Sequence, residues 1–204
     1  MSMVSLASVI KEVSAKHRCH TLILYGSWAR GDTMPSSDCD LLAICKNGND
    51  IVQDARKWRG IYLDVFVYPE RKIKAANLIH VRGGKVLKQK GQFGDRLLAR
   101  IDRLYRRGPK PPTADQLAAW KVWQQKMLKR IANGDCESNF RRAWLLTALL
   151  EDYFVFHNRW YEGPKLSLQW LRANEPEIYR RFEAALKPGS DLSALKELVA
   201  AVSV

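Results

Sequence analysis

Two aspartates separated by one residue, Asp38 and Asp40, are the side chains of this 204-residue chain best placed for chemistry. Side chains two residues apart on a strand point to the same face of a sheet, so we expect the two carboxylates to converge. Two unpaired carboxylates repel and raise each other's pKa, and a divalent cation removes that conflict. The pair therefore predicts a metal site.

A Gly-Ser step, Gly26-Ser27, precedes the aspartates and ends the apolar run at residues 22–25. Glycine leaves the backbone open, and serine adds a hydroxyl and an N–H, a combination suited to holding phosphate oxygens. A loop rich in glycine, proline and serine then leads to Asp38. Together, the step and the aspartates suggest a metal-nucleotide site.

A third carboxylate, Asp64, lies in the middle of the apolar run at residues 61–68, which is the strongest strand signal in the chain. Burying a lone carboxylate is costly unless it is paired, hydrogen-bonded or bound to a metal, so we expect Asp64 to join the other two. Three carboxylates beside a Gly-Ser turn suit two-metal phosphoryl or nucleotidyl transfer. The alternative is an ordinary turn at Gly26-Ser27 with Asp38 as a turn or cap residue, which is weaker once Asp64 is considered.

The elements that must position these residues follow from hydrophobic periodicity and turn signals. Strands are predicted at 20–25, 40–45, 61–68 and 85–89. Helices are predicted at 5–16, 27–30, 51–58, 69–79 and 94–107. The first half of the chain thus reads as an α/β domain that carries the carboxylates.

The prolines of residues 109–113 form the clearest boundary, because clustered prolines cannot continue a helix and stiffen a connector. Beyond this linker every segment reads as helix, at 114–132, 137–157, 164–174, 176–186 and 190–202. We predict an N-terminal domain at 1–108, a linker at 109–113 and a helical-bundle domain at 114–204.

These residues also carry a resemblance to a known family. The motif runs Gly26-Ser27, Arg30-Gly31, Ser37-Asp38-x-Asp40 and Asp64, and it spans about residues 22–68. It resembles the signature of the nucleotidyltransferase superfamily of the DNA polymerase β type, in particular the branch with the kanamycin and other aminoglycoside nucleotidyltransferases and the minimal, antitoxin-like nucleotidyltransferases. The resemblance implies an α+β fold, a mixed-sheet nucleotidyltransferase domain followed by a C-terminal helical bundle.

The resemblance also implies roles for the motif residues. Magnesium (Mg2+) would be held by Asp38, Asp40 and Asp64, which would be the catalytic carboxylates. Gly26 and Ser27 would contact the triphosphate, and by analogy Arg30 would help with the phosphates. The implied reaction moves a nucleoside monophosphate, AMP from ATP, onto a hydroxyl of an acceptor and releases pyrophosphate.

One acidic residue of the most apolar predicted helix, Glu151, is a candidate general base. Thr147, Glu151 and Asn158 fall on one stripe at helical spacing, which could face the catalytic domain. In the kanamycin-type relatives a glutamate of the helical domain has this role. The alternative is an ion pair with one of three arginines, Arg141, Arg142 or Arg159.

Near the start of the predicted helix at 164–174 lies Lys165, a candidate for nucleotide binding. A cation gains nothing from the helix dipole at this end, which hints at a phosphate ligand. The alternative is a solvated lysine.

The charge balance bears on the acceptor. The chain carries 34 Lys and Arg against 21 Asp and Glu, a net charge of +13, and such a field attracts polyanions. A row of arginines, Arg96, Arg100, Arg103 and Arg107, lies on one face of the predicted helix at 94–107, either as a solvated face or as a phosphate-backbone site. Aminoglycosides are polycations, so a tRNA or protein acceptor is favoured. An aminoglycoside-type small-molecule transferase and a non-catalytic, antitoxin-like binding module are the alternatives.

The four cysteines stand singly in the sequence, without the spacing of a zinc site or of a secreted disulfide framework. Residues 1–17 lack the basic segment and long apolar core of a signal peptide. The longest apolar run, residues 143–156, is too short to span a membrane. We therefore expect a cytoplasmic protein without a membrane segment.

Overall fold

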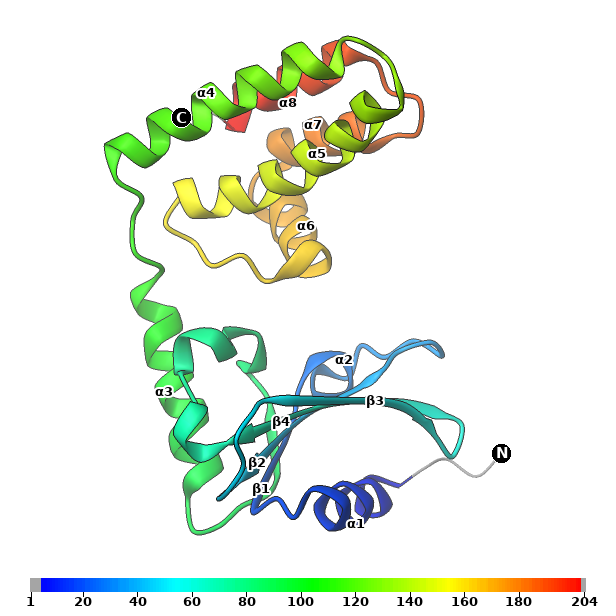
Figure 1. Ribbon diagram of the computed structural model, residues 1–204, viewed down its shortest axis with the longest axis vertical. Coiled ribbons are helices and arrows are strands. Elements are labelled where there is room, and N and C mark those ends of the chain that lie inside the picture. The colour runs from blue at the N-terminus through cyan, green and yellow to red at the C-terminus, as the bar shows by residue number, and fades with distance from the viewer. Residues whose placement is uncertain (1–4, 203–204) are drawn as a thin grey trace. The chain divides into compact units, whose positions relative to one another are not determined.

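The computed structural model describes residues 5–202 and divides into two compact units, one ending at Arg107 and the other beginning at Gly108 (Figure 1). The first unit is built on a mixed five-stranded sheet, and the second contains helices (Figure 1). The predicted α+β class is confirmed. The exact division into two domains and a linker stays a prediction.

The sheet has the strand order β3-β4-β2-β1-β5. Its strands are β1 (Thr21–Leu24), β2 (Cys39–Cys45), β3 (Val52–Trp58), β4 (Ile61–Pro69) and β5 (Lys85–Lys88). Only β2 and β4 pair in parallel, and the other neighbours are antiparallel. The two strands that carry predicted aspartates therefore run side by side, in the same direction, in the middle of the sheet.

Helix α1 (Leu6–His17) covers one face of this sheet (Figure 1). Its fully buried Val9 and Val13 belong to one apolar cluster with alternate residues of the central strands. Those residues are Leu22, Leu24, Cys39, Leu41, Ala43, Leu63 and Val65. Because strand side chains alternate between faces, the residues between them, including those at 40 and 64, point to the opposite face.

The rest of the first unit consists of short helices and one longer helix. These are α2 (Gly26–Arg30), the 3-10 helices η1 (Glu70–Lys72) and η2 (Ala75–Val81), and α3 (Phe93–Arg107). Helix α3 packs on η2, β1 and β5 through its buried Leu97 and Ile101. A Cβ on Gly94 would come within 2.9 Å of Val86, so the start of α3 lies close against β5.

The prediction of a helix at residues 51–58 is wrong, because Val52–Trp58 forms edge strand β3, paired with β4 over its whole length. A tight hairpin turn joins the two strands, with positive φ at both Arg59 (48°) and Gly60 (88°). Such a turn matches the natural twist of paired strands and fixes their register. The apolar residues at 52, 55 and 58 mimic a helical spacing, but pairing with β4 decides the structure.

The second unit holds α4 (Ala114–Ile131), α5 (Cys136–Phe156), α6 (Gly163–Asn174), α7 (Pro176–Leu186) and α8 (Leu192–Val202). Thr113 caps α4 in a reciprocal pair with Gln116, and Asp135 caps α5 through the Ser138 N–H. Fully buried side chains from α5 to α8 form a common core: Leu145, Leu149, Leu171, Phe182 and Leu198. Among residues 5–202, no helix combines the length and apolar character needed to span a membrane.

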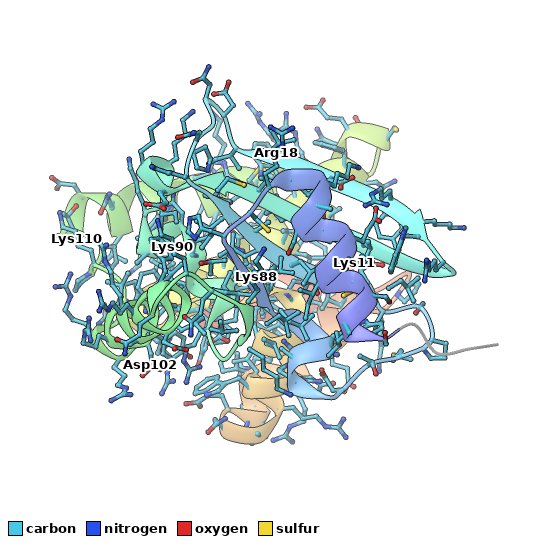
Figure 2. All side chains as sticks on the ribbon, turned by 90° about the horizontal axis from the view of Figure 1, so that it is seen from below. Lys11, Arg18, Lys88, Lys90, Asp102 and Lys110 are labelled. Carbon is cyan, nitrogen blue, oxygen red and sulfur yellow. The ribbon has the colours of Figure 1, made fainter. Side chains whose placement is uncertain are left out.

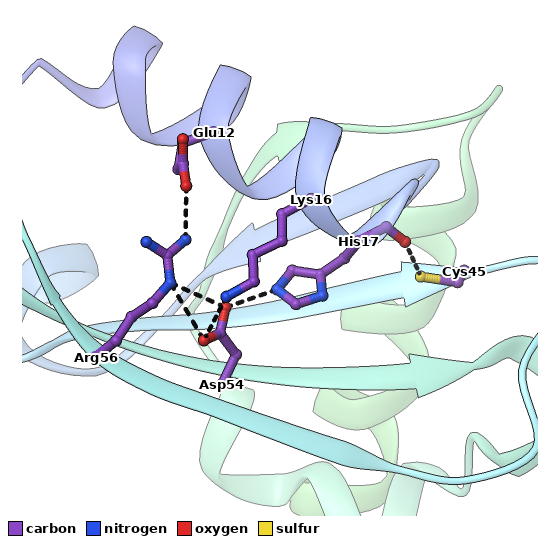
Figure 3. A network of polar contacts seen from close by, with 6 residues as sticks. All are labelled: Glu12, Lys16, His17, Cys45, Asp54 and Arg56. Atoms are coloured by element: carbon purple, nitrogen blue, oxygen red, sulfur yellow. Dashed lines mark hydrogen bonds and ion pairs between the residues drawn. The ribbon is translucent and has the colours of Figure 1, made fainter.

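A polar network ties α1 to the edge strand β3 (Figure 3). The carboxylate of Asp54 accepts hydrogen bonds from Lys16 Nζ at 3.0 Å, His17 Nε2 at 2.8 Å and Arg56 Nε at 3.2 Å. Arg56 Nη2 in turn donates to Glu12 Oε1 at 2.8 Å. Partial burial opposes ionisation of Asp54, but these bonds outweigh it and lower its pKa to about 2.

The Asp54 network gives the first unit a defined acid sensitivity. Because the pKa is lower in the folded chain, the carboxylate stabilises the fold above about pH 4, and this stabilisation disappears as the pH falls toward about 2. We expect Asp54→Asn to lower the free energy of unfolding of this unit by on the order of 1 kcal/mol at neutral pH, after allowance for solvent screening.

Hydrogen–deuterium exchange of peptides from α1 and β3, compared at matched pH, measures this difference. It should shrink as both proteins are acidified. A suitable control is Asp50→Asn, because Asp50 is an exposed loop carboxylate paired with Lys72. An equal loss of protection in the two variants at every pH would contradict the prediction.

Candidate active site

Two of the predicted catalytic carboxylates lie directly opposite each other on neighbouring strands. Asp40 on β2 is in parallel register with Asp64 on β4. Both point away from α1, because their strand neighbours pack into the α1 cluster. Adjacent strands lie about 4.8 Å apart, so the register holds the two acidic groups side by side.

The third predicted carboxylate, Asp38, is exposed in the loop that leads into β2. Burial raises the pKa of Asp40 to about 6, helped by the negative charges of Asp64 and Asp38, while Arg30 acts in the opposite direction. The charge of Asp38 therefore acts on Asp40. The site concentrates negative charge on a half-buried carboxyl group that has little cationic compensation from the protein.

Asp64 has a partner that the sequence analysis missed. Gln53 Nε2, on the edge strand β3, donates a hydrogen bond to Asp64 Oδ1 at 2.8 Å. This bond fixes the orientation of one carboxylate of the pair. A helix at 51–58 does not predict this contact, whereas the Arg59-Gly60 turn between two strand-like runs is a signal that does.

Gly26 lies against the same carboxylate pair. The Tyr25 N–H donates to the Asp40 carbonyl oxygen at 3.0 Å, which brings the start of α2 next to β2. Gly26 then adopts a positive φ of 67°, and a Cβ added there would lie only 2.0 Å from Asp40 Oδ2. Only glycine satisfies both the backbone conformation and the lack of space.

The other two predicted phosphate contacts follow on the same short helix. Ser27 is half-buried at the second position of α2. Arg30 is its last residue, exposed, and its Nε lies 3.3 Å from Asp32 Oδ1. The structure thus brings Gly26 to the pair, and the charge of Arg30 acts on Asp40.

The donor set suits a hard divalent cation, because carboxylate oxygens are the ligands that such ions prefer. Asp40 and Asp64 supply a preformed pair on one face of the sheet. Within residues 5–202, however, no three His, Cys, Asp or Glu side chains are already gathered into a metal-binding group. The three-aspartate metal site stays a prediction: Asp40 and Asp64 lie in register, and Asp38 lies in the exposed loop before β2.

The remaining two candidates, Glu151 and Lys165, belong to the second unit. Glu151 and Thr147 are exposed on α5, but Asn158 lies beyond the helix end at Phe156 with a φ of 55°, so the predicted three-residue stripe is wrong at Asn158. Lys165 is exposed in the first turn of α6. The roles of Glu151 as general base and of Lys165 as a phosphate contact stay predictions.

The three arginines considered as alternative partners of Glu151 make other contacts. Arg141 pairs with Glu137 one helical turn earlier. Arg142 donates to Ser190 Oγ at 2.6 Å, and the Arg159 guanidinium lies over the Trp170 ring at 4.1 Å from its centroid. Each of these three arginines therefore has a partner other than Glu151 within the helical unit.

The neighbouring carboxyl group, Asp152, is the one that the helical unit buries. It is 9% exposed and accepts a hydrogen bond from Gln124 Nε2 on α4 at 3.1 Å. Burial raises its pKa to about 6, against the opposing effect of the Gln124 bond and with a further increase from the charge of Glu151. The sequence pattern showed two adjacent acids but not which of them faces the core.

The mixed sheet, with two aspartates in parallel register beside a Gly-Ser turn, agrees with a domain for phosphoryl or nucleotidyl transfer. Comparison with known families supports this class, because residues 6–94 match the family model described as nucleotidyltransferase domain. Residues 6–94 therefore form a nucleotidyltransferase domain. This confirms the predicted superfamily and the predicted class of enzyme, a nucleotidyltransferase, while the particular branch stays a prediction.

Among solved structures, a nucleotidyltransferase-like protein from Exiguobacterium sibiricum is similar to the chain at 12% sequence identity and a TM-score of 0.44. The similarity covers 96% of this chain and 73% of the other. No curated protein matches the sequence.

A substitution at Gly26 tests the close approach to Asp40. Gly26→Ala should reduce nucleotidyl transfer by on the order of 100-fold, because the new methyl group must displace the Asp40 carboxylate. Gly31→Ala is the matched control, since Gly31 also has a positive φ (85°) but has no atom within 4 Å of an added Cβ. Both variants bear a backbone penalty of about 1 kcal/mol. Comparable activity in the two variants, measured as pyrophosphate release, would show that the approach is unimportant.

Removing the buried charge of Asp152 should stabilise the helical unit. The folded pKa lies above that of the unfolded chain, so stability is greatest below about pH 4 and decreases as the pH rises through about 6. Asp152→Asn keeps an acceptor for Gln124 and should raise the free energy of unfolding by about 2 kcal/mol at neutral pH. Urea unfolding, monitored by hydrogen–deuterium exchange of α4 and α5 peptides, measures the increase in the free energy of unfolding. Glu151→Gln, at the adjacent exposed position, should leave stability nearly unchanged.

Proposed function

We propose that this protein is a magnesium-dependent nucleotidyltransferase that moves AMP from ATP onto an acceptor hydroxyl and releases pyrophosphate. The observation that carries the proposal is the Asp40–Asp64 register pair, with Gly26 held so close to Asp40 that no side chain fits between them. Carboxylates arranged in this way, on the face of the sheet away from α1 and beside a glycine turn, suit the binding of a metal-nucleotide complex.

Asp40 and Asp64 would hold the metal, and Asp38 would complete the set from its loop. Bound Mg2+ supplies neutralisation of the phosphate charge and activation of the attacking hydroxyl. Gln53 positions Asp64 through its 2.8 Å hydrogen bond. The backbone at Gly26 and Ser27, with the cation of Arg30 at the end of α2, would orient the triphosphate so that the α-phosphate faces the acceptor.

The acceptor is proposed to be a hydroxyl of tRNA or of a protein. The net charge of +13 disfavours polycationic antibiotics as substrates, because such a field repels them at long range. In the described part of the chain the four cysteines are free thiols, which supports the proposal of a reducing cytoplasm as the protein's location.

The test is pyrophosphate release from each of the four nucleoside triphosphates with Mg2+, in the presence of tRNA or candidate proteins. We expect release with ATP, and we expect Asp40→Asn and Asp64→Asn to reduce it by at least about 1000-fold, because each removes charge that holds the metal. Chelation of the divalent ion should abolish release in the wild type.

Asp50→Asn is the control, because it removes an exposed carboxylate of the same unit, one that is paired with Lys72 rather than with the site. It should retain full activity. If Asp40→Asn also retained full activity, the metal assignment would be wrong. If the wild type released no pyrophosphate with any nucleotide or acceptor, the alternative of a non-catalytic binding module would replace this proposal.

A further inference from the structure

The outer face of α3 carries four exposed arginines and no acidic neighbour to offset them. Arg96, Arg100, Arg103 and Arg107 are all exposed, on the side away from the buried Leu97 and Ile101. At 1.5 Å per residue, the row is about 16 Å long. We name this row of four residues the α3 arginine face.

The two acidic residues of α3 do not neutralise this face. Asp102 pairs with Arg82 and Arg106, and Asp95 accepts a hydrogen bond from Gln89 Nε2 at 2.6 Å. Within residues 5–202, the structure gives none of the four arginines a carboxylate partner, and Arg96 donates only to Gln92 Oε1. Like charges three and four residues apart destabilise a helix, so an arrangement of this kind needs another reason.

More positive charge lies on the chain segment that leads into α3. Lys85 and Lys88 are exposed on the edge strand β5, and Lys90 is exposed in the loop that follows it. Figure 2 shows Lys88 and Lys90 at the end of the unit where α3 begins, with Asp102 on the helix itself. Lys88 Nζ is held by the carbonyl oxygen of Cys19 at 3.0 Å. The strand and the loop that precede α3 therefore also carry exposed cations.

The positive charge of the protein is concentrated in this unit. Residues 1–107 contain 20 Lys and Arg against 10 Asp and Glu, a net charge of +10. Residues 108–204 contain 14 against 11, a net charge of +3. Three of the ten acids of the first unit are the predicted metal ligands, so the remaining surface is more basic than the net charge indicates.

The side chains on and around the α3 arginine face indicate which kind of partner it binds. In the described part of the chain, none of the exposed large apolar side chains lies on α3 or β5. A membrane-binding helix needs apolar residues to insert, and a protein interface needs an apolar centre. Exposed, regularly spaced guanidinium groups without such residues suit a chain of phosphates, whose recognition is largely electrostatic.

We propose that the α3 arginine face binds the phosphate backbone of a nucleic acid. The next step rests on the proposed function. The bound nucleic acid is the acceptor, and the enzyme modifies a hydroxyl of RNA rather than of a protein. The arginines hold the backbone of the acceptor while the Asp40–Asp64 pair carries out the transfer. Base identity is not read by this face, because phosphate contacts carry no sequence information.

The test replaces all four arginines by glutamine, a residue of similar helix propensity, in the full chain. Binding of labelled tRNA, single-stranded RNA and single-stranded DNA is followed by fluorescence anisotropy at several salt concentrations, without nucleotide or metal. We expect affinity for RNA to fall at least about tenfold and the slope of log affinity against log salt to decrease by about 2 to 3, since each lost phosphate contact contributes about 0.7. Comparison of the affinities for RNA and DNA shows which of the two nucleic acids the protein binds more tightly.

The control variant removes the same number of charges from an exposed helix of the second unit. It carries glutamine at Lys121, Lys126, Lys129 and Arg130 of α4. Equal losses of RNA binding in the two variants would overturn the proposal, because binding would then depend on net charge alone. The proposal would also be overturned if the wild type bound no nucleic acid. Binding to phosphatidylserine vesicles and to acidic proteins is measured in the same way, and a loss confined to these partners in the α3 variant would overturn the proposal too.

Pyrophosphate release measured in parallel separates this proposal from the proposed function. RNA binding that depends on α3, in a wild type that releases no pyrophosphate, would refute the transfer and its acceptor but leave the binding surface established. RNA-dependent release that is unchanged in the α3 variant would refute the role of the surface and leave the transfer intact.

Discussion

The parallel register of β2 and β4 is the constraint on which the candidate site depends, because it places Asp40 directly opposite Asp64. A shift of one residue in either strand would turn its aspartate toward the α1 cluster and expose apolar residues in exchange. The buried neighbours Leu41, Leu63 and Val65 therefore do more than fill the core. Their burial keeps two mutually repelling carboxylates on the same face.

This arrangement needs support from both sides of the pair. On one side, β1 ends at Leu24 and the Tyr25–Asp40 backbone hydrogen bond brings Gly26 into place. On the other side, a two-residue turn folds β4 back along β3, and this pairing places Gln53 beside Asp64. The edge strand is itself anchored to α1 through Asp54. Positioning of the site thus extends from the glycine turn to a polar network on the opposite face of the sheet.

The sequence predicted most of this fold because its strong signals agree with the tertiary contacts. The apolar runs of β1, β2 and β4, the prolines near 109–113 and the amphipathic α3 each have one structural solution. The helix predicted at residues 51–58 is wrong because this edge strand gains its structure from pairing with β4, which local periodicity does not show. For the same reason the sequence proposes the three aspartates as candidates but not Gln53, whose approach to Asp64 depends on that pairing.

In the helical unit, too, the sequence predicts the elements but not which side chain faces the core. Its helices follow from periodicity and caps, yet the sequence could not distinguish Glu151 from Asp152, since a shift of 100° around the helix separates solvent from core. Gln124 on α4 decides the matter by meeting Asp152 in the interior. Adjacent acidic residues are thus assigned by the helix packed against them, just as the paired strand assigns the partner of Asp64.

The acidic site and the basic surface of the first unit are two parts of one electrostatic arrangement. Seven of the ten acids in this unit lie outside the predicted metal set, and each makes a polar contact: Glu12, Asp32, Asp50, Asp54, Glu70, Asp95 and Asp102. Six of these acids pair with a Lys, Arg or His side chain and Asp95 accepts from the Gln89 amide, whereas Asp40 and Asp64 bring two carboxylates together on neighbouring strands. A field that is positive at long range attracts phosphate groups, and under the proposed function the local carboxylates would accept them together with a cation.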